Sequence, residues 1–392
     1  MLSQVMLARR AMQLSTVPAH PPTGDRISLD SGYASPEILP DLRAAASSAL
    51  DGHRSEALQY GPPFGLPRLR EWIASFVRDD GVDVEPDGVL IVNGAKNGLE
   101  LVCRTMLDEG DAVVVTAPTY FTALPILRSF EVELIEVAQD GEGLDVRALQ
   151  TVLRRRVRDG KAPPKFVYDV PDFHNPTGIT MSRRRREDLV AAAESAGVAI
   201  VEDTPYRWLR YGGTSEPSLR ELDSSENVIA LGTFSKLLAP GLRIGWVLGP
   251  QSLLDRMARL KGDGGSCPLT QRIIYEFVKD GALEAHLRRA RSLYTSHRDA
   301  MVSALSRELP EAAFTVPLGG YYLWLRFPDG VDGSELAAAA YERGVSIIGG
   351  DPFYASAGLR PNPHVRLAFS KSTPREIDEG VRLLAGAYRS IR

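Results

Sequence analysis

The sequence predicts an α/β fold: a large domain of three layers around a mainly parallel sheet, with a smaller α+β domain. From about residue 65 onward, short runs of β-branched residues alternate with stretches of helical period. These runs are continuously apolar, as at 89–92, which is typical of parallel strands that helices cover on both faces. After about residue 282 the alternation stops, and a long helix precedes several short strands.

The elements of the large domain follow from these patterns. Pro67 opens a helix whose apolar residues share one face, and a second helix follows Gly94. Two further helices are expected at 145–157 and 183–196, and the basic run at 183–186 is expected to be the solvated start of the second. The expected strands, in chain order, are 89–92, 112–116, 132–137, 165–170, 199–203, 228–232 and 244–249.

The C-terminal part predicts a separate, smaller unit. A helix from 282 to about 308 precedes strands at 313–316, 321–327, 346–348 and 365–369, and a helix from Pro374 closes the chain. The pattern leaves room for an antiparallel or mixed sheet. We therefore expect an N-terminal helix and linker at 1–24, a small domain from 25–45 with 282–392, and a large domain at 46–281.

Composition and charge exclude several classes of function. In 392 residues, 46 Lys and Arg face 50 Asp and Glu, so the net charge of −4 provides no field for nucleic acid or an acidic membrane. No apolar stretch reaches 18 residues, so no membrane span is encoded. Two cysteines indicate a reducing, cytoplasmic compartment, and we expect no metal site. Arg9 and Arg10 interrupt any secretory signal, although a transit peptide is conceivable.

Lys236 is the first candidate for chemistry. It follows the strand at 228–232, and ligands of such sheets bind beyond the carboxyl ends of the strands. Its amine could form a Schiff base with a carbonyl. The hydroxyls of Thr233 and Ser235 and the guanidinium of Arg243 could hold a phosphate. The alternative is a surface lysine in a loop of hydroxyl residues.

Asp203 and Tyr206 follow another buried strand. A carboxylate there needs a cationic partner, which a protonated pyridine nitrogen would supply. The hydroxyl of Tyr206 could donate to a neighbouring oxygen. The alternative is a helix N-cap at Asp203 or Thr204.

Two further strand ends carry turn residues. Asn175-Pro-Thr-Gly178 is ordinary turn chemistry, but at a strand end it can present an amide to a ligand. Gly94, Ala95 and Lys96 begin a helix, where backbone N–H groups form an anion site. The chain contains neither a GxGxxG nor a Walker pattern, so dinucleotides and nucleoside triphosphates are poorly supported.

These segments together resemble the motifs of class I/II aminotransferases. The motifs occur in the family's order: Tyr60-Gly61-(x)3-Gly65-Leu-Pro-x-Leu-Arg70, Asn175-Pro-Thr-Gly178, Glu202-Asp-x-x-Tyr206, Ser235-Lys-(x)3-Pro-Gly-x-Arg243-x-Gly245 and Val365-Arg-Leu367. The chain is similar to fold-type-I pyridoxal-phosphate (PLP) enzymes, and most to the 2-aminoadipate and kynurenine aminotransferases. The likeness runs from about Ile27 to the C-terminus.

The resemblance implies a role for each matching residue. Lys236 would hold PLP as a Schiff base, Asp203 would keep its ring nitrogen protonated, and Asn175 and Tyr206 would hydrogen-bond its ring oxygen. Tyr120 would stack on the ring, while Arg366 would clamp the substrate α-carboxylate beside Gly32. The phosphate would be held by Gly94, Ala95, Lys96, Thr233, Ser235 and Arg243, with Tyr60 reaching in from a partner subunit.

The chain departs from the family pattern in two places. Ala95 and Lys96 stand where relatives usually have a small hydroxyl residue and Gln, so backbone contacts survive but side-chain contacts are in doubt. His174 replaces the Gln that most relatives have before the Asn-Pro-Thr-Gly turn. It could shuttle a proton, or it could be a packing residue with its hydrogen bonds satisfied.

The resemblance implies an enzyme that moves the amino group of an L-amino acid to a 2-oxo acid in a ping-pong cycle, with 2-oxoglutarate as the expected acceptor. Shared active sites imply a homodimer. The alternative is another PLP reaction on the same scaffold: a decarboxylase, eliminase, cyclase or oxidase. A ligand-sensing module of a transcription regulator is a third hypothesis, which the acidic charge and the short segment before the match disfavour.

Overall fold

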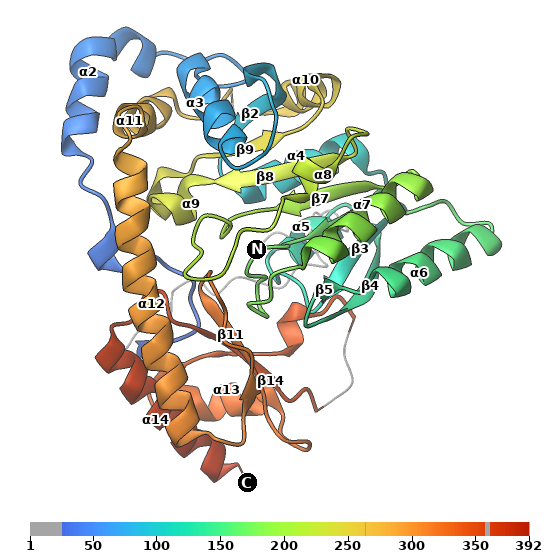
Figure 1. Ribbon diagram of the computed structural model, residues 1–392, viewed down its shortest axis with the longest axis vertical. Helices are drawn as coiled ribbons and strands as arrows, with labels where there is room; N and C mark the ends of the chain where they lie inside the picture. Colours follow the sequence, from blue (N-terminus) through green and yellow to red (C-terminus); the bar gives the residue numbers. More distant parts are fainter. Residues whose placement is uncertain (1–25, 263, 357–360, 392) are drawn as a thin grey trace, which may run out of the picture.

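The computed structural model describes residues 26–262, 264–356 and 361–391. The predicted N-terminal helix and linker at 1–24 lie outside the described residues. Figure 1 shows an upper part built on a large sheet and a lower part of C-terminal strands and helices. The long helix α12 (Ala282–Glu308) runs along one edge from the upper part to the lower.

The large sheet has eight strands in the order β2-β9-β8-β7-β6-β3-β4-β5. Neighbours from β8 to β4 pair in parallel, and β9 and β5 pair antiparallel with their neighbours. The prediction of a mainly parallel sheet is thus confirmed. The strands are β2 (Val89–Val92), β3 (Ala112–Ala117), β4 (Glu133–Asp140), β5 (Gly143–Leu144), β6 (Phe166–Asp169), β7 (Ala199–Asp203), β8 (Val228–Thr233) and β9 (Gly245–Leu248).

Helices cover both faces of this sheet. Alternate residues of each strand point to opposite faces, so each strand packs against both layers of helices. Val113 and Val115 pack with Leu99 and Val102 on one face, while Val114 packs with the opposite layer of helices. Central strands are buried throughout, as their apolar runs predicted, but β4 near the edge is partly exposed. The helices of this part are α2 (Arg43–Ala57), α3 (Pro67–Arg78), α4 (Ala95–Met106), α5 (Ala123–Arg128), α6 (Val146–Arg158), α7 (Arg183–Ala196), α8 (Leu219–Leu222), α9 (Phe234–Leu237), α10 (Gln251–Leu260) and α11 (Pro268–Val278).

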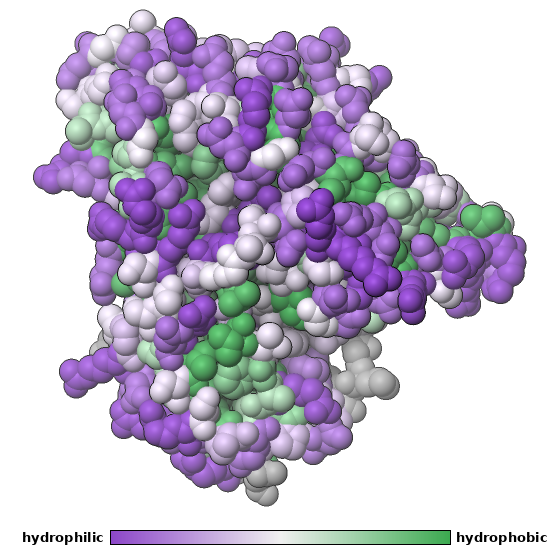
Figure 2. Space-filling model, in the orientation of Figure 1, coloured by the Kyte–Doolittle hydropathy of each residue, from purple (hydrophilic) through white to green (hydrophobic). Residues whose placement is uncertain are grey.

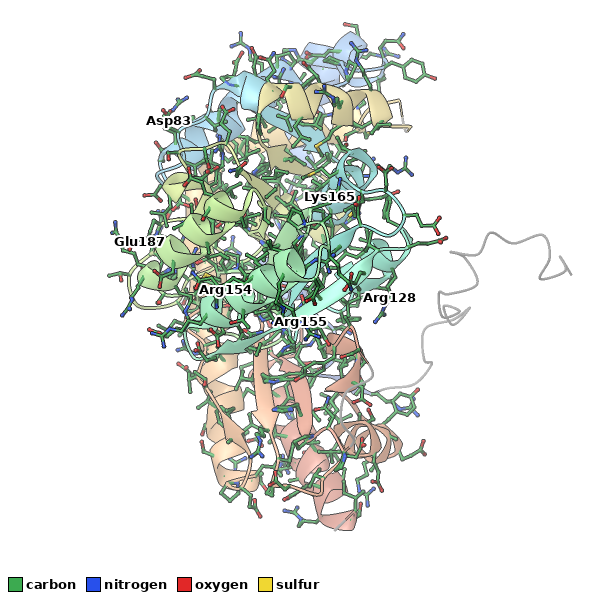
Figure 3. The ribbon with its side chains drawn as sticks, turned by 90° about the vertical axis from the view of Figure 1, so that its right-hand side faces the viewer. Asp83, Arg128, Arg154, Arg155, Lys165 and Glu187 are labelled. Atoms are coloured by element: carbon green, nitrogen blue, oxygen red, sulfur yellow. The ribbon has the colours of Figure 1, made fainter. Side chains whose placement is uncertain are left out.

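The outer sides of α6 and α7 are mostly hydrophilic (Figure 2). Arg154, Arg155 and Glu187 lie on this outer surface (Figure 3). The basic run at 183–186 was expected to be solvated. That expectation is wrong for Arg186, whose side chain is fully buried and pairs with Asp172 at 2.8 Å. Arg186 is the fourth residue of α7, and the turn of the helix places it on the buried face of the helix.

The C-terminal strands form an antiparallel sheet in the order β10-β11-β14-β13. The predicted strand at 346–348 is in fact two strands, because the chain leaves one sheet for another at residue 347. β12 pairs in parallel with β1, which brings Ile27 and Ser28 to the C-terminal part. The elements are β1 (Ile27–Ser28), β10 (Ala313–Phe314), β11 (Tyr322–Arg326), β12 (Val345–Ser346), β13 (Ile348–Gly349), β14 (His364–Ala368), α13 (Gly333–Glu342) and α14 (Pro374–Ser390).

Short 3-10 helices connect these elements at Pro36–Ile38, Pro86–Gly88, Pro240–Leu242 and Asp351–Phe353. Each of them begins with proline or carries it at its second position, where the missing N–H has no helical partner to lose.

Among the helices of the described ranges, none is long and apolar enough to cross a bilayer.

Candidate active site

A cavity of about 470 Å³ opens at the carboxyl ends of β6, β7 and β8, where the parallel sheet predicts a ligand site. Every residue predicted for the site lines it except Gly94 and Tyr60. The lining residues that were predicted are Gly32, Ala95, Lys96, Tyr120, Asn175, Asp203, Tyr206, Thr233, Ser235, Lys236, Arg243 and Arg366.

Lys236 lies on α9, the short helix that follows β8. Its Nζ donates a hydrogen bond of 2.7 Å to the carbonyl oxygen of Gly32. Burial lowers the pKa of this amine, with Arg366 and Arg243 acting in the same direction and Tyr322 opposing them. The alternative of a surface lysine is therefore wrong. The site favours an amine that can give up its proton.

Asp203 ends β7 and is almost completely buried. The hydroxyl of Tyr168 donates to its Oδ2 at 2.8 Å, while Oδ1 has no hydrogen-bond partner among the described residues. Burial raises the pKa of this carboxyl to about 7, although Tyr168 works against the rise. No helix begins at Asp203, so the N-cap alternative is also wrong. A buried carboxylate with a free oxygen is suited to a cationic ligand atom.

Arg366 and Asn175 meet in the same cavity. Arg366 comes from β14, and its Nη1 donates to Oδ1 of Asn175 at 3.0 Å. Its Nη2 donates to the carbonyl oxygen of Asp30. Both side chains are buried, yet Nε of Arg366 and Nδ2 of Asn175 have no partner in the described part of the chain. Both residues line the cavity that also holds Lys236, and each has one unsatisfied donor.

The start of α4 forms the anion-binding end of the cavity. Ala95 and Lys96 are its first two residues, so their N–H groups have no partner within the helix. Gly94 precedes them with φ of +86°, and a Cβ there would lie 3.1 Å from Nη2 of Arg243. Gly94 therefore lets Arg243 approach the helix without lining the cavity itself. Thr233 and Ser235 add two hydroxyls, whose oxygens are 3.0 Å apart.

Tyr120 and Tyr206 both line the cavity. Burial raises the pKa of Tyr120 to about 12 and that of Tyr206 well above its usual value, so both remain protonated phenols. The hydroxyl of Tyr206 donates to that of Tyr322, with 3.3 Å between the oxygens.

Sequence reasoning missed four aromatic residues of the site. Tyr168 donates a hydrogen bond to Asp203, while Tyr33, Phe121 and Tyr322 line the cavity. Tyr168 carried a signal, since a phenol in a buried strand needs a hydrogen-bond partner. Phe121 and Tyr322 carried none, because each follows a tyrosine in a segment that also reads as core.

His174 does not line the cavity. Its ring nitrogens lie 3.0 Å from Oγ1 of Thr177 and 3.3 Å from Oγ1 of Thr116, and burial lowers its pKa to about 3. An uncharged, hydrogen-bonded ring of this kind favours the packing interpretation over the proton shuttle.

Tyr60 lies away from this cavity, on the surface after α2, with 88% of its area exposed. Within one chain it therefore contributes nothing to the site.

The unsatisfied atoms fit the cofactor that the sequence motifs imply. A free carboxylate oxygen suits a protonated ring nitrogen, and a free amide N–H suits a ring oxygen. The helix start, the two hydroxyls and Arg243 suit a phosphate. The amine of Lys236 lies in the same cavity.

Comparisons with known proteins agree with this geometry. The model of the family "Aminotransferase class I and II" matches residues 25–384. The aromatic-amino-acid aminotransferase 1 of Thermococcus litoralis is 33% identical over 98% of this chain and 93% of its own length. The 2-aminoadipate transaminase of Thermus thermophilus is 34% identical over 93% and 90%.

A solved structure gives the same assignment. The kynurenine aminotransferase of Pyrococcus horikoshii, in complex with PMP, matches with a TM-score of 0.92 and 33% identity, over 99% of this chain and 98% of that one. The chain therefore belongs to the class I and II aminotransferase family, as a pyridoxal-phosphate-dependent, fold-type-I aminotransferase of the 2-aminoadipate and kynurenine branch.

Proposed function

We propose that this enzyme transfers the amino group of an L-amino acid to 2-oxoglutarate in a ping-pong cycle. The observation that carries the proposal is the set of unpartnered buried atoms around Lys236: Asp203 Oδ1, Asn175 Nδ2 and Arg366 Nε. Leaving such atoms unsatisfied costs stability unless a ligand satisfies them. Each has the charge or polarity that one part of the cofactor and substrate requires.

The cofactor would be held at four points. Asp203 would pair with the ring nitrogen, Nδ2 of Asn175 and the hydroxyl of Tyr206 would donate to the ring oxygen, and Tyr120 would stack on the ring. The phosphate would lie at the start of α4. Its ligands would be the backbone N–H groups of Ala95 and Lys96, the hydroxyls of Thr233 and Ser235, and the guanidinium of Arg243, which Gly94 allows to approach.

Bound PLP supplies an electron sink for negative charge that develops at the substrate Cα. Lys236 would take the proton from Cα, since burial lowers the pKa of its amine and so favours the neutral form. Asp203 would keep the ring nitrogen protonated, and Tyr206 would hydrogen-bond the ring oxygen. Arg366 would hold the α-carboxylate beside Gly32 in both half-reactions, because its planar fork matches a carboxylate.

The amino donors would have aromatic or long side chains. Tyr33, Phe121 and Ile348 contribute apolar surface to the lining of the cavity. Relatives include the aromatic-amino-acid, 2-aminoadipate and kynurenine enzymes. We therefore expect activity with one or more donors of these three kinds.

The working enzyme would be a homodimer with shared active sites. Five exposed large apolar side chains lie in the segment 33–60, which contains α2: Tyr33, Leu39, Leu50, Leu58 and Tyr60. We expect the partner subunit to cover part of this exposed apolar surface. Tyr60, which reaches no cavity residue in its own chain, would contact the phosphate site of the partner.

We propose the domain division given above: a large domain at 46–281, and a small domain from 25–45 with 282–392. The pairing of β1 with β12 supports it, since it ties residues 27 and 28 to the C-terminal strands. A cytoplasmic location is also part of the proposal, in keeping with free Cys103 and Cys267.

The test is to incubate the loaded enzyme with candidate donors and 2-oxoglutarate, and to measure glutamate, ammonia and carbon dioxide. Glutamate formed in equal amount to the 2-oxo acid product supports the proposal. Ammonia or carbon dioxide without glutamate from any donor would assign another PLP reaction. The control is Lys236→Ala, which should form none of these products.

A further inference from the structure

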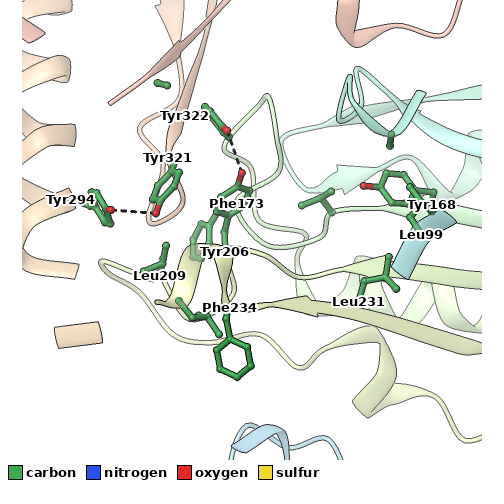
Figure 4. Close-up of a cluster of buried hydrophobic side chains, with 14 of the residues drawn as sticks. Leu99, Tyr168, Phe173, Tyr206, Leu209, Leu231, Phe234, Tyr294, Tyr321 and Tyr322 are labelled. Carbon is green, nitrogen blue, oxygen red and sulfur yellow. Dashed lines mark hydrogen bonds between the residues drawn. The ribbon is translucent and has the colours of Figure 1, made fainter. Parts of the chain in front are cut away.

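Two consecutive tyrosines enter the active site where β11 begins. The ring centroid of Tyr321 lies 5.2 Å from Nζ of Lys236, and Tyr322 lines the same cavity. Figure 4 shows both rings, with Tyr322 turned toward Tyr206 and Tyr321 turned toward Tyr294. The proposed function assigns no role to the hydroxyl of Tyr322.

The hydroxyl of Tyr322 is held in one place by its neighbours. A Cβ on Gly32 would lie only 1.9 Å from its oxygen, so the phenol occupies the space where residue 32 would carry a side chain. The guanidinium carbon of Arg366 lies 4.2 Å from the centre of its ring. Gly32 also accepts the hydrogen bond of Lys236. The phenol of Tyr322 therefore lies between Arg366, which is proposed to hold the substrate carboxylate, and Gly32, which accepts the hydrogen bond of the Lys236 amine.

The phenols of Tyr206 and Tyr322 form a buried pair. Their side chains are nearly inaccessible, their rings are almost perpendicular, and their oxygens are 3.3 Å apart. The titratable or charged groups that face this pair are Tyr120, Asp203, Lys236, Tyr321 and Arg366.

A hydroxyl group donates one hydrogen bond and can accept others. When Tyr206 gives its proton to the ring oxygen of the cofactor, its own oxygen is left to accept from Tyr322. In a low-dielectric site, a donor that itself accepts a hydrogen bond donates more strongly. We propose that Tyr322 is a positioning residue, whose hydroxyl donates to Tyr206 and strengthens the hydrogen bond of Tyr206 to the cofactor. This inference rests on the proposed role of Tyr206.

The colour of the loaded enzyme provides a readout that is independent of turnover. Its visible absorbance changes when the nitrogen of Lys236, joined to the cofactor, loses its proton. The form that has lost this proton carries more negative charge, and a hydrogen bond to the ring oxygen stabilises it. Weakening the hydrogen bond therefore raises the midpoint, the pH at which half of the enzyme has lost the proton. Tyr206→Phe removes the donor, and Tyr322→Phe removes only the group behind it.

We expect Tyr322→Phe to raise the midpoint by about 0.5 to 1 pH unit, the size of one modest hydrogen bond. Tyr206→Phe should raise it further, and adding Tyr322→Phe to that variant should change nothing more. The matched control is Tyr294→Phe, which breaks a second tyrosine pair with the same 3.3 Å separation, between Tyr294 and Tyr321. Because Tyr294 does not line the cavity, its variant should keep the wild-type midpoint.

The outcomes separate the two proposals. If Tyr206→Phe shifts the midpoint and Tyr322→Phe does not, the role of Tyr322 is wrong and the proposed function stands. If Tyr206→Phe does not change the midpoint, the proposed role of Tyr206 is wrong, and the inference about Tyr322 is wrong as well. An equal shift from Tyr294→Phe would assign the effect to packing, which also overturns it.

A second variant keeps the test valid if Tyr322→Phe does not fold. Incorporating 3-fluorotyrosine at position 322 preserves the ring and makes the hydroxyl a stronger donor. The midpoint should then fall, opposite to the change in Tyr322→Phe. A midpoint that stays at the wild-type value would overturn the inference.

Discussion

The hydroxyl of Tyr168 donates a 2.8 Å hydrogen bond to one oxygen of Asp203 and leaves the other oxygen without a partner among the described residues. The two residues lie on neighbouring parallel strands, β6 and β7. One strand thus fixes the orientation of the carboxylate, and the cavity offers its free oxygen to a ligand. This arrangement makes the stability of the cofactor-free enzyme depend on pH.

Asp203→Asn should remove that pH dependence. Burial raises the pKa of Asp203 to about 7 in the folded chain, against ~3.9 when unfolded. Between these values the folded state holds more of the Asp203 proton, so the contribution of Asp203 to stability is greatest below pH ~4 and falls as the pH rises toward 7. Relative to Asp203→Asn, the cofactor-free wild type should lose on the order of 3 kcal/mol across this range.

Urea denaturation of both proteins at several pH values measures this difference. Bound PLP should abolish it, since a cationic ring nitrogen stabilises the charged carboxylate. Parallel stability curves for the two cofactor-free proteins would contradict the account.

Asp172→Asn should destabilise the enzyme strongly. The carboxylate is fully buried between Arg186 at 2.8 Å and Arg207 at 3.1 Å. Its neutralisation leaves two buried guanidinium groups short of a counter-charge, at a cost of about 3–5 kcal/mol in unfolding free energy. Chemical denaturation measures this cost.

The control for Asp172→Asn is Glu187→Gln, which breaks the exposed pair with Arg183 at 2.9 Å and should leave the unfolding free energy unchanged. Similar losses of unfolding free energy in the two variants would show that burial does not determine how much the ion pairs of Asp172 contribute.

Gly232→Ala should be destabilising because of Trp246. A Cβ at position 232 would lie 2.1 Å from the indole ring, which is itself buried in the core. Overpacking of this kind costs about 1–3 kcal/mol. Gly141→Ala is the matched control, since no atom lies within 4 Å of its added Cβ. Thermal unfolding should separate the two variants, and equal melting temperatures would refute the steric argument.

His174→Gln should retain kcat within about tenfold of the wild type. Burial lowers the pKa of His174 to about 3, so its ring does not change charge across the working range. The pH profile of kcat/KM should therefore keep its shape. Loss of the acidic or basic limb in this variant alone would restore the proton-shuttle hypothesis.

The residues that follow predicted strands could be placed from the sequence, because a parallel sheet brings all these ends to one edge. Lys236, Asp203 and Asn175 converge for this reason. Tyr322 could not be placed in the same way, since it begins a strand in the other sheet and lines the cavity only through the packing of the two parts. Arg186 was misjudged because its exposure depends on the helix face and not on the local charge run.

The split of segment 346–348 had a different cause. Residues on either side of Ile347 pair with strands that are far apart in the sequence, β1 and β14, and a single apolar run does not record which partner each residue takes.

The central claim is that Lys236 carries the cofactor. Borohydride reduction of the loaded enzyme, followed by digestion and mass spectrometry, tests it most directly. We predict one phosphopyridoxyl group, attached to the peptide that contains Lys236. Attachment to a different lysine, or an unmodified peptide from visibly loaded enzyme, would contradict the claim.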